Sequence, residues 1–327
     1  MEQHNPSVSI IIPVRNSKDH LNICVESILN QTYEFIDEII LGVGPSDDGT
    51  HKIATELESI EPRIKIVDNP SGKTASALNA AASVATGRYL VRVDTHCKLE
   101  KNYVRQAIRT IQRTKAANVG GIQKAEGRSI LERSIATAMT SRFGVGNSRF
   151  HYGGEEGPSD TVYLGVYDSD VFYQLGGFNE TLIRNQDYEL NIRMRKNGNT
   201  VWFDPNLVVR YTPRSSIQDL FRQYFQYGQW KREVVKLHPT SIKARQIAAP
   251  LLVIGILFGI VSSIFLNIWG LAIPSVYLAG VFLASLISTS SDGWGRLCLI
   301  FVFPTMHIAW GLGFLLGPIR QRRRQGV

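Results

Sequence analysis

The sequence has few cysteines, and none stands in a spacing typical of a structural site. Its three cysteines, Cys24, Cys97 and Cys298, lie far apart and form no C-x-x-C pair. This excludes a zinc site built on paired cysteines and a disulfide framework, and it fits a reducing compartment. The first apolar run, Val8 to Val14, is too short for the core of a secretory signal and contains Pro13. We therefore expect the amino-terminal part to stay in the cytoplasm.

Acidic residues are outnumbered by basic ones, 28 against 36, which gives a net charge of +8. Such a surplus can indicate nucleic-acid binding, but no nucleic-acid motif is present. Many of the cations instead flank one apolar region, where they favour lipid head groups. We therefore expect a membrane partner and no nucleic-acid partner; the flanking cations are Lys231, Arg232, Lys236, Lys243 and Arg245 before the region, and Arg320, Arg322, Arg323 and Arg324 after it.

Charged residues are nearly absent between residues 247 and 319. Three apolar segments in this region are each about as long as a bilayer is thick, namely 247–267, 271–288 and 297–317. Three crossings would place the basic tail opposite a cytoplasmic catalytic domain, against the positive-inside tendency. Either that tendency is broken here or one segment does not cross, the short second segment and the Pro304-interrupted third being the candidates. Polar residue His307 in the third segment has either a functional or a packing role.

The region before residue 216 alternates strand and helix patterns. Short apolar, β-branched runs at 8–14, 38–43, 64–68 and 88–93 are separated by segments with helical spacing. This alternation predicts an α/β fold with βαβ units and a mostly parallel, Rossmann-like sheet. Ligands bind such sheets at the carboxyl ends of the strands, where polar loops follow each run. The predicted divisions are a catalytic domain, 1–215, a juxtamembrane helix, 216–246, membrane helices, 247–319, and a basic tail, 320–327.

The run that ends at Val93 is followed by Asp94-Thr95-His96. In an extended backbone Asp94 and His96 project to the same face. A carboxylate and an imidazole at that spacing can hold a divalent cation, which in turn can bind a diphosphate. The alternative is a strand end that carries two solvated polar residues.

Five ordered motifs resemble those of family 2 glycosyltransferases with the GT-A fold, and among these the bacterial succinoglycan-biosynthesis type. The motifs are Pro13-Val14-Arg15-Asn16, Ser46-Asp47-Asp48-Gly49-Thr50, Asn69-Pro70-Ser71-Gly72-Lys73 with Leu78-Asn79-Ala80-Ala81, Val93-Asp94-Thr95-His96, and Gly176-Gly177-Phe178-Asn179-Glu180 with Asn185-Gln186-Asp187-Tyr188-Glu189. Each motif alone is weak, so the specificity lies in their order. The resemblance covers about the first 230 residues.

The resemblance implies a role for each motif. It implies that Asp94 and His96 hold Mn²⁺ or Mg²⁺, which neutralises the leaving nucleotide diphosphate. Asp187 is implied as the base that deprotonates the acceptor hydroxyl, with a helix-start carboxylate as the alternative. Arg15 and Lys73 are implied as phosphate or acceptor contacts, with ordinary surface charges as the alternative. The implied donor-binding set is Pro13, Arg15, Asn16, Asp47, Asp48, Lys73, Asn79 and Asp94.

Some positions depart from the family pattern. An acidic nucleotide contact is missing around Val43, Gln186 stands where a glutamate is common, and Tyr211 stands where a metal-contacting histidine is common. A third protein ligand for the cation is therefore unassigned, with His151 and His238 as weak candidates. The Gly-rich stretch 140–157 is expected to close over a ligand, with a disordered loop as the alternative.

Residues 216–238 alternate aromatic and basic side chains at helical spacing. This pattern predicts a helix in the head-group plane, or one that packs its aromatic face on protein. Its stretch Gln226 to Trp230 loosely resembles a motif of processive polysaccharide synthases.

The sequence therefore predicts a membrane-anchored, inverting glycosyltransferase at the cytoplasmic face of the plasma membrane. It would transfer a sugar from a nucleotide-sugar, a UDP-sugar by preference, to a lipid-linked saccharide acceptor in polysaccharide or glycoconjugate synthesis. Alternatives are transfer directly to a polyprenyl phosphate, or a catalytically silent membrane scaffold that binds nucleotide or saccharide.

Overall fold

The computed structural model describes residues 5–288 and 293–318, which form two compact units. The first unit comprises Met1–Ala125 and Ser148–Thr212, and the second comprises Glu126–Asn147 and Pro213–Val327. The second unit thus includes a segment of the region 1–215 that the sequence had assigned to one domain. The predicted tail, 320–327, lies outside the described residues.

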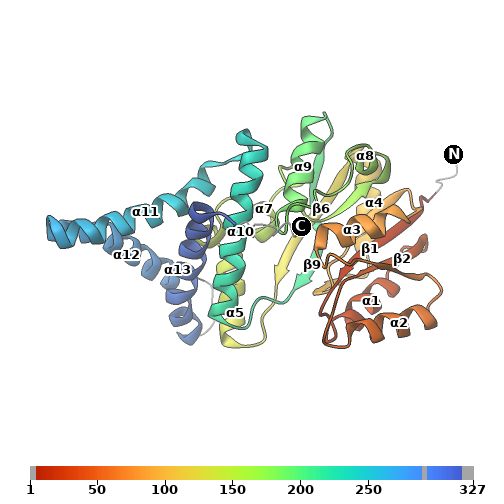
Figure 1. The fold of residues 1–327 in the computed structure, drawn as a ribbon, viewed down its shortest axis with the longest axis horizontal. Helices are drawn as coiled ribbons and strands as arrows, with labels where there is room; N and C mark the ends of the chain where they lie inside the picture. The colour runs from red at the N-terminus through yellow and green to blue at the C-terminus, as the bar shows by residue number, and fades with distance from the viewer. Residues whose placement is uncertain (1–4, 289–292, 319–327) are drawn as a thin grey trace, which may run out of the picture. The chain divides into compact units, whose positions relative to one another are not determined.

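The first four strands form the parallel βαβ arrangement that the sequence predicts (Figure 1). They stand in the order β3-β2-β1-β4, and every neighbouring pair is parallel. Each following helix begins just after the carboxyl end of its strand. The elements are β1 (Val8–Val14), α1 (Leu21–Leu29), β2 (Ile36–Val43), α2 (Thr50–Ile60), β3 (Ile64–Asp68), α3 (Thr74–Ser83) and β4 (Tyr89–Arg92).

The other strands make the sheet mixed rather than mostly parallel, which corrects the sequence prediction. The strand β8 (Tyr163–Asp168) runs antiparallel to both β4 and β6 (Asn118–Ala125). The strand β9 (Val201–Tyr211) is parallel to β6 but antiparallel to β5 (Cys97–Leu99) and β7 (Gly157–Pro158). Apolar periodicity reports which face of a strand is buried and carries no information about the direction of its neighbour.

Both faces of the sheet are covered, so its central strands are apolar at successive positions. In β1, Ile10 and Ile12 belong to one buried cluster and Ile11 to the other, each with 0% exposure. Burying one such side chain contributes about 1.5–3 kcal/mol before conformational entropy is counted. Helix α3 lies close to β2 because Gly42 has no side chain; a Cβ there would lie 2.5 Å from the Ala77 carbonyl oxygen.

The first unit also contains three longer helices and one short helix that lies within the Gly-rich stretch 140–157. They are α4 (Tyr103–Thr114), α7 (Arg149–Tyr152), α8 (Ser169–Gln174) and α9 (Gln186–Lys196). Asp168 starts α8 by accepting hydrogen bonds from the backbone of Asp170 and Val171.

All regular secondary structure in the described part of the second unit is helical. The unit contains α5 (Ile130–Met139), α6 (Arg142–Val145), α10 (Ile217–Leu237), α11 (Ala244–Phe265), α12 (Ala272–Ile287), α13 (Gly293–Leu316) and two 3₁₀ turns, Pro239–Ser241 and Ile268–Leu271. Three spans are long and apolar enough to cross a membrane: Ala244–Phe265, Ile268–Ile287 and Gly293–Leu316. They correspond to the three apolar segments of the sequence, and α10 corresponds to the expected juxtamembrane helix.

Candidate functional site

The polar loops at the carboxyl ends of β1, β2 and β4 are tied to one another. The Ser17 hydroxyl lies 2.9 Å from the Thr95 hydroxyl, and the Ser17 backbone N–H donates to the Thr50 hydroxyl at 2.7 Å. Asn16 accepts from the Asp47 backbone N–H, while its own backbone donates to Ser46. These contacts confirm that the loops converge at one edge of the sheet, as the topology predicts.

Arg15 and Lys73 connect this edge to neighbouring segments. The Arg15 guanidinium donates to the Gly72 carbonyl oxygen at 3.2 Å, which joins the loops after β1 and β3. The Lys73 ammonium donates to the Glu180 carbonyl oxygen at 3.3 Å. Both residues are exposed, so both cations can still reach a ligand. Pro13 lies inside β1, in register with Gly42.

Asp47 and Asp48 differ in what their carboxylates do. Asp48 accepts from the Thr50 hydroxyl and from the backbone N–H groups of Thr50 and Lys18. These hydrogen bonds, that of the Thr50 hydroxyl first, hold the pKa of Asp48 below its usual value. Asp48 thus braces the loop, whereas the exposed Asp47 is better placed to contact a nucleotide.

Asn79 holds the Gly-Gly-Phe segment rather than pointing its amide into open space. Its Oδ1 accepts from the Phe178 backbone N–H at 2.9 Å, and its Nδ2 donates to the Phe178 carbonyl oxygen at 2.8 Å. Nδ2 also lies 2.9 Å from Glu180 Oε1. A Cβ at Gly177, where φ is +68°, would lie 2.7 Å from Asn79 Oδ1, so both backbone freedom and space require glycine there.

Asp94 forms a bidentate ion pair with Arg92. The Nε and Nη2 atoms of Arg92 lie 2.9 and 3.1 Å from the two carboxylate oxygens of Asp94. The Arg92 side chain is 7% exposed, and its guanidinium lies over the Phe178 ring, 5.7 Å from the centroid. No role was predicted for Arg92 from the sequence, although the same alternation that pairs Asp94 with His96 also places Arg92 on their face.

Arg92 also feels the charge of both carboxylates that the resemblance singles out. Burial alone would lower the pKa of Arg92, but the negative charges of Asp94 and then Asp187 raise it overall. Tyr167, whose pKa burial raises, feels the same three charges. Asp94, from the end of β4, and Asp187, from the first turn of α9, therefore both interact electrostatically with the Arg92 guanidinium.

His96 is exposed and has a second imidazole beside it. The ring of His20, from the loop that precedes α1, meets the His96 ring edge-on with centroids 4.7 Å apart. Thr95, between Asp94 and His96 in the sequence, is buried, and its hydroxyl lies against that of Ser17. No role was predicted for His20 from the sequence, because its distance along the chain hides its proximity to His96.

The residues of this loop fit a divalent cation. No group of three or more metal-ligating side chains occurs within residues 5–288 and 293–318. An ionised carboxylate has about four lone-pair sites, so the Arg92 contacts leave room on Asp94 for a metal. One carboxylate oxygen and one imidazole nitrogen suit Mn²⁺ whose other positions are filled by phosphate and water oxygens. His151 belongs to the first unit and His238 to the second, and neither completes such a group.

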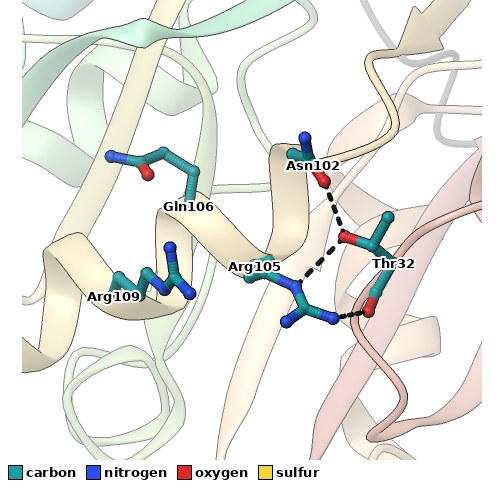
Figure 2. A pocket seen from close by; sticks show the side chains of 5 residues that line it. All are labelled: Thr32, Asn102, Arg105, Gln106 and Arg109. Carbon is teal, nitrogen blue, oxygen red and sulfur yellow. Dashed lines mark hydrogen bonds between the residues drawn. The ribbon is translucent and has the colours of Figure 1, made fainter.

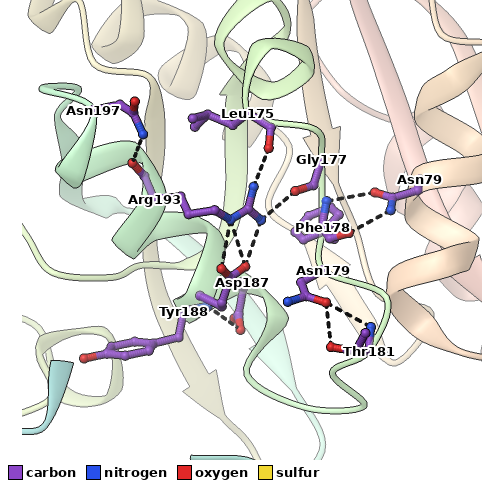
Figure 3. A network of polar contacts seen from close by, with 11 residues as sticks. Asn79, Leu175, Gly177, Phe178, Asn179, Thr181, Asp187, Tyr188, Arg193 and Asn197 are labelled. Carbon is purple, nitrogen blue, oxygen red and sulfur yellow. Dashed lines mark hydrogen bonds and ion pairs between the residues drawn. The ribbon is translucent and has the colours of Figure 1, made fainter. Parts of the chain in front are cut away.

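Glu189, which follows Asp187 by two residues, has a structural partner (Figure 3). Its carboxylate is 3% exposed and lies 2.8 Å from Nη2 of Arg193. Arg193 also donates to the carbonyl oxygens of Leu175 at 2.6 Å and Gly177 at 2.7 Å. The pair therefore fastens α9 to the Gly-Gly-Phe segment, so Glu189 has a structural role.

A separate hollow lies on the first unit, away from this edge (Figure 2). It is lined by Thr32, Asn102, Arg105, Gln106 and Arg109. Thr32 stands between α1 and the start of β2, so the hollow is at the amino ends of the strands. The Arg105 guanidinium is already bonded to the Thr32 hydroxyl, at 3.1 Å, and to its carbonyl oxygen.

Comparison with known proteins identifies the fold. Residues 9–176 match the model of the family described as glycosyl transferase family 2. The structure of the mannosyltransferase PcManGT from Pyrobaculum calidifontis, in complex with GDP-Man and Mn²⁺, covers 96% of this chain and 88% of its own at a TM-score of 0.62 and 16% identity. The predicted GT-A fold is thereby confirmed.

Two curated relatives match much of the chain. The succinoglycan biosynthesis protein ExoA of Rhizobium meliloti is 28% identical over 99% of this chain and 98% of its own length. A dolichyl N-acetyl-alpha-D-glucosaminyl phosphate 3-beta-D-2,3-diacetamido-2,3-dideoxy-beta-D-glucuronosyltransferase of Methanococcus voltae is 31% identical over 70% of this chain and 74% of its own. The first confirms the predicted succinoglycan-type subgroup.

Proposed function

Because the chain belongs to glycosyl transferase family 2, we propose that it transfers a sugar, in one displacement with inversion, from a UDP-sugar to a lipid-linked saccharide. The observation that carries the proposal is the bidentate ion pair of Arg92 with Asp94 after β4, whose guanidinium also feels the negative charge of Asp187 in the first turn of α9. One carboxylate lies at the donor loops and the other at the start of α9, as a displacement with separate donor and acceptor sides requires.

The chain's own residues divide this reaction between them. Asp187 takes the proton of the acceptor hydroxyl as that oxygen attacks the anomeric carbon. Arg15 and Lys73 attract the diphosphate, and Asp47 is placed for the nucleotide. Asp94 and His96 would hold a divalent cation, which supplies positive charge to the departing diphosphate.

The acceptor is inferred from the second unit and from the relatives. Its apolar helices provide a membrane anchor, and the Methanococcus voltae relative is named for a dolichyl-phosphate-linked sugar. An enzyme held at the membrane meets a lipid-linked acceptor at high local concentration. We place the catalytic unit at the cytoplasmic face, where nucleotide-sugars are made.

A donor screen tests the proposal. The purified full-length protein is mixed with UDP-, GDP- and dTDP-sugars, with Mn²⁺ or with chelator, and its thermal stability and sugar-nucleotide hydrolysis are measured. We expect a UDP-sugar with Mn²⁺ to raise the melting temperature and to be slowly hydrolysed. A response to GDP-sugars alone would refute the UDP assignment, and no response to any donor would favour a silent scaffold.

Substitution of the two imidazoles tests the metal assignment. His96→Ala should weaken Mn²⁺-dependent donor binding by roughly tenfold or more, the scale on which even outer-sphere partners act. His20→Ala is the companion variant: this ring touches His96 from another loop and is not assigned as a ligand, so its effect on donor binding should be smaller than that of His96→Ala. Calorimetric titration of donor into each variant measures the effect, and an unchanged affinity in His96→Ala contradicts its assignment as a ligand.

Arg92 acts as a positioning residue that neutralises Asp94 and Asp187 before a ligand arrives. We expect Arg92→Met to bind Mn²⁺ in the absence of donor roughly tenfold more tightly, because the competing positive charge is gone. Turnover should nevertheless fall, because the two carboxylates lose the cation that aligns them. Mn²⁺ affinity is read from the electron paramagnetic resonance signal of the free ion.

Arg92→Lys is the companion variant. It keeps the charge and loses the planar fork, so Mn²⁺ affinity should stay near that of the unmodified protein. Weaker Mn²⁺ binding in Arg92→Met would mean that the guanidinium supports the metal site only by holding its shape.

A further inference from the structure

Helices α11 and α12 form a hairpin, and most of its length exposes apolar side chains. Gly259 of α11 meets Gly270, and Gly255 meets Ile273, so α12 returns beside α11. From residue 254 through the turn to residue 276 the hairpin exposes large apolar side chains on all sides, which is typical of a lipid-facing segment. Examples with their exposed fractions are Phe258 64%, Ile264 68%, Trp269 78% and Val276 73%.

The third helix, α13, is covered on more of its surface by other helices of its unit. It packs along α10 and against α5, and it also touches the hairpin, where the Tyr277 hydroxyl of α12 lies 3.0 Å from His307 Nδ1. As a result 39% of its most apolar window is buried, against 17% for each of the other two spans. Gly228 of α10 and Gly313 of α13 allow the two backbones to approach closely: a Cβ on either would lie about 2 Å from the other helix, 2.1 Å from Trp310 O and 2.0 Å from Phe225 O respectively.

Polar groups bind α13 at both of its ends. Near its start, the Ser134 hydroxyl of α5 donates to the Gly295 carbonyl oxygen at 3.1 Å. At its end, Arg232 of α10 donates to the carbonyl oxygens of Phe314 and Leu315, and Gln229 donates to that of Gly317 at 2.8 Å. The guanidinium thus serves the carbonyl groups that a helix leaves unpaired at its end.

The connectivity of the chain indicates on which side of the membrane α5 and α10 lie. The first unit ends at Ala125 and resumes at Ser148, so α5 and α6 are tied to it within a few residues at both ends. Helix α10 starts five residues after Thr212, where the first unit ends, and bears exposed charged residues such as Arg222 and Lys236. A helix that crossed the bilayer could not keep one end on α5 and the other on Arg232 unless charged residues entered the hydrocarbon, at about 2.5–3.5 kcal/mol or more each.

Figure 1 shows the same relation within the second unit: the α11–α12 hairpin runs across the direction shared by α5, α10 and α13. One apolar stripe of α13 remains open, formed by Trp294, Leu297, Phe301 and Leu316. A helix with one bare apolar face and one protein-covered face suits the boundary between head groups and acyl chains.

We propose that α13 lies in the membrane interface with α5 and α10, and that only the α11–α12 hairpin enters the hydrocarbon. Helix α11 has 22 residues, about 33 Å at 1.5 Å per residue, close to the hydrocarbon thickness of about 30 Å. The chain thus returns to the membrane side that it left, which is the even number of crossings that the positive-inside tendency of this sequence favours.

Fluorescence quenching by nitroxide lipids tests the depth of each helix. Full-length protein carrying Cys298→Ser is given one new cysteine, Phe301→Cys in α13 or Leu257→Cys near the middle of α11, labelled with bimane and reconstituted into phosphatidylcholine–phosphatidylglycerol vesicles. The native Cys24 and Cys97 are buried and should stay unlabelled. Phe301→Cys should be quenched more by shallow than by deep nitroxides, and Leu257→Cys the reverse. Stronger deep quenching at Phe301→Cys, or no quenching at either position, overturns the proposal.

Sidedness supplies an independent measurement. In vesicles of uniform orientation, Val327→Cys should react with a membrane-impermeant maleimide together with His51→Cys, an exposed position on α2 of the catalytic unit. Reaction of the two cysteines from opposite sides would mean an odd number of crossings and would refute the interfacial α13. Donor binding by the same variants reports on the proposed function separately.

Discussion

Asp187→Asn should abolish sugar transfer and leave donor binding intact. The asparagine keeps the shape of the side chain at the first turn of α9 but cannot accept the acceptor's proton. General-base catalysis contributes about 10²- to 10⁴-fold, so kcat should fall on that scale while the affinity for donor and Mn²⁺ stays within about twofold. The reason for the separation is that Asp187 stands on α9, whereas the donor contacts stand on the loops after β1 to β4.

Transfer is measured by the appearance of glycosylated lipid acceptor, and donor affinity by titration calorimetry on the same sample. Asp170→Asn is the matched control, because Asp170 also lies in the first turn of a helix, α8, and its side chain is 83% exposed and pairs only loosely with Arg88 at 3.7 Å. It should retain full activity. If Asp187→Asn also retained activity, Asp187 would be only a helix-start residue; if donor binding fell as much as kcat, its role would be to hold the pocket through Arg92.

The sequence predicts the catalytic fold well in the part whose strands and helices follow from local patterns of apolar residues. Strand and helix periodicity locates β1 to β4 and their helices, and topology then brings the loops to one edge. It fails for β8 and β9, whose direction depends on how the chain returns to the sheet from α4 to α9. No local pattern encodes that return, because each strand's alternation looks the same in either direction.

The candidate site, too, is predicted only in part from the sequence. Motif order locates Asp94, His96 and Asp187, but it cannot distinguish a ligand contact from a brace. Asn79 and Asp48 are held by hydrogen bonds inside the protein, to the Phe178 backbone and to Thr50, and those partners become visible only in three dimensions. His20 was missed because it meets His96 across 76 residues of chain.

Arg193→Met should destabilise the first unit more than any other single change in this region. The substitution removes the guanidinium from a buried carboxylate, Glu189, and from the carbonyl oxygens of Leu175 and Gly177. Breaking one partner of a buried pair costs about 3–5 kcal/mol, which corresponds to roughly 10 °C in melting temperature for a unit of this size. Circular dichroism of the full-length protein in detergent measures the shift. Arg195→Met, on the same helix and exposed, is the control and should shift the midpoint little.

Neutralising Glu189 as well separates two effects: the cost of its buried charge, and the loss of the hydrogen bonds that Arg193 donates. In Arg193→Met with Glu189→Gln, no uncompensated charge remains, so much of the lost stability should return. The Gly-Gly-Phe segment would still lack its two hydrogen bonds from Arg193, so donor affinity should remain reduced even where the melting temperature recovers. If the double variant were as unstable as Arg193→Met alone, most of the lost stability would come from the carbonyl contacts and not from the buried carboxylate. Equal melting temperatures for Arg193→Met and Arg195→Met would contradict the structural role of the pair altogether.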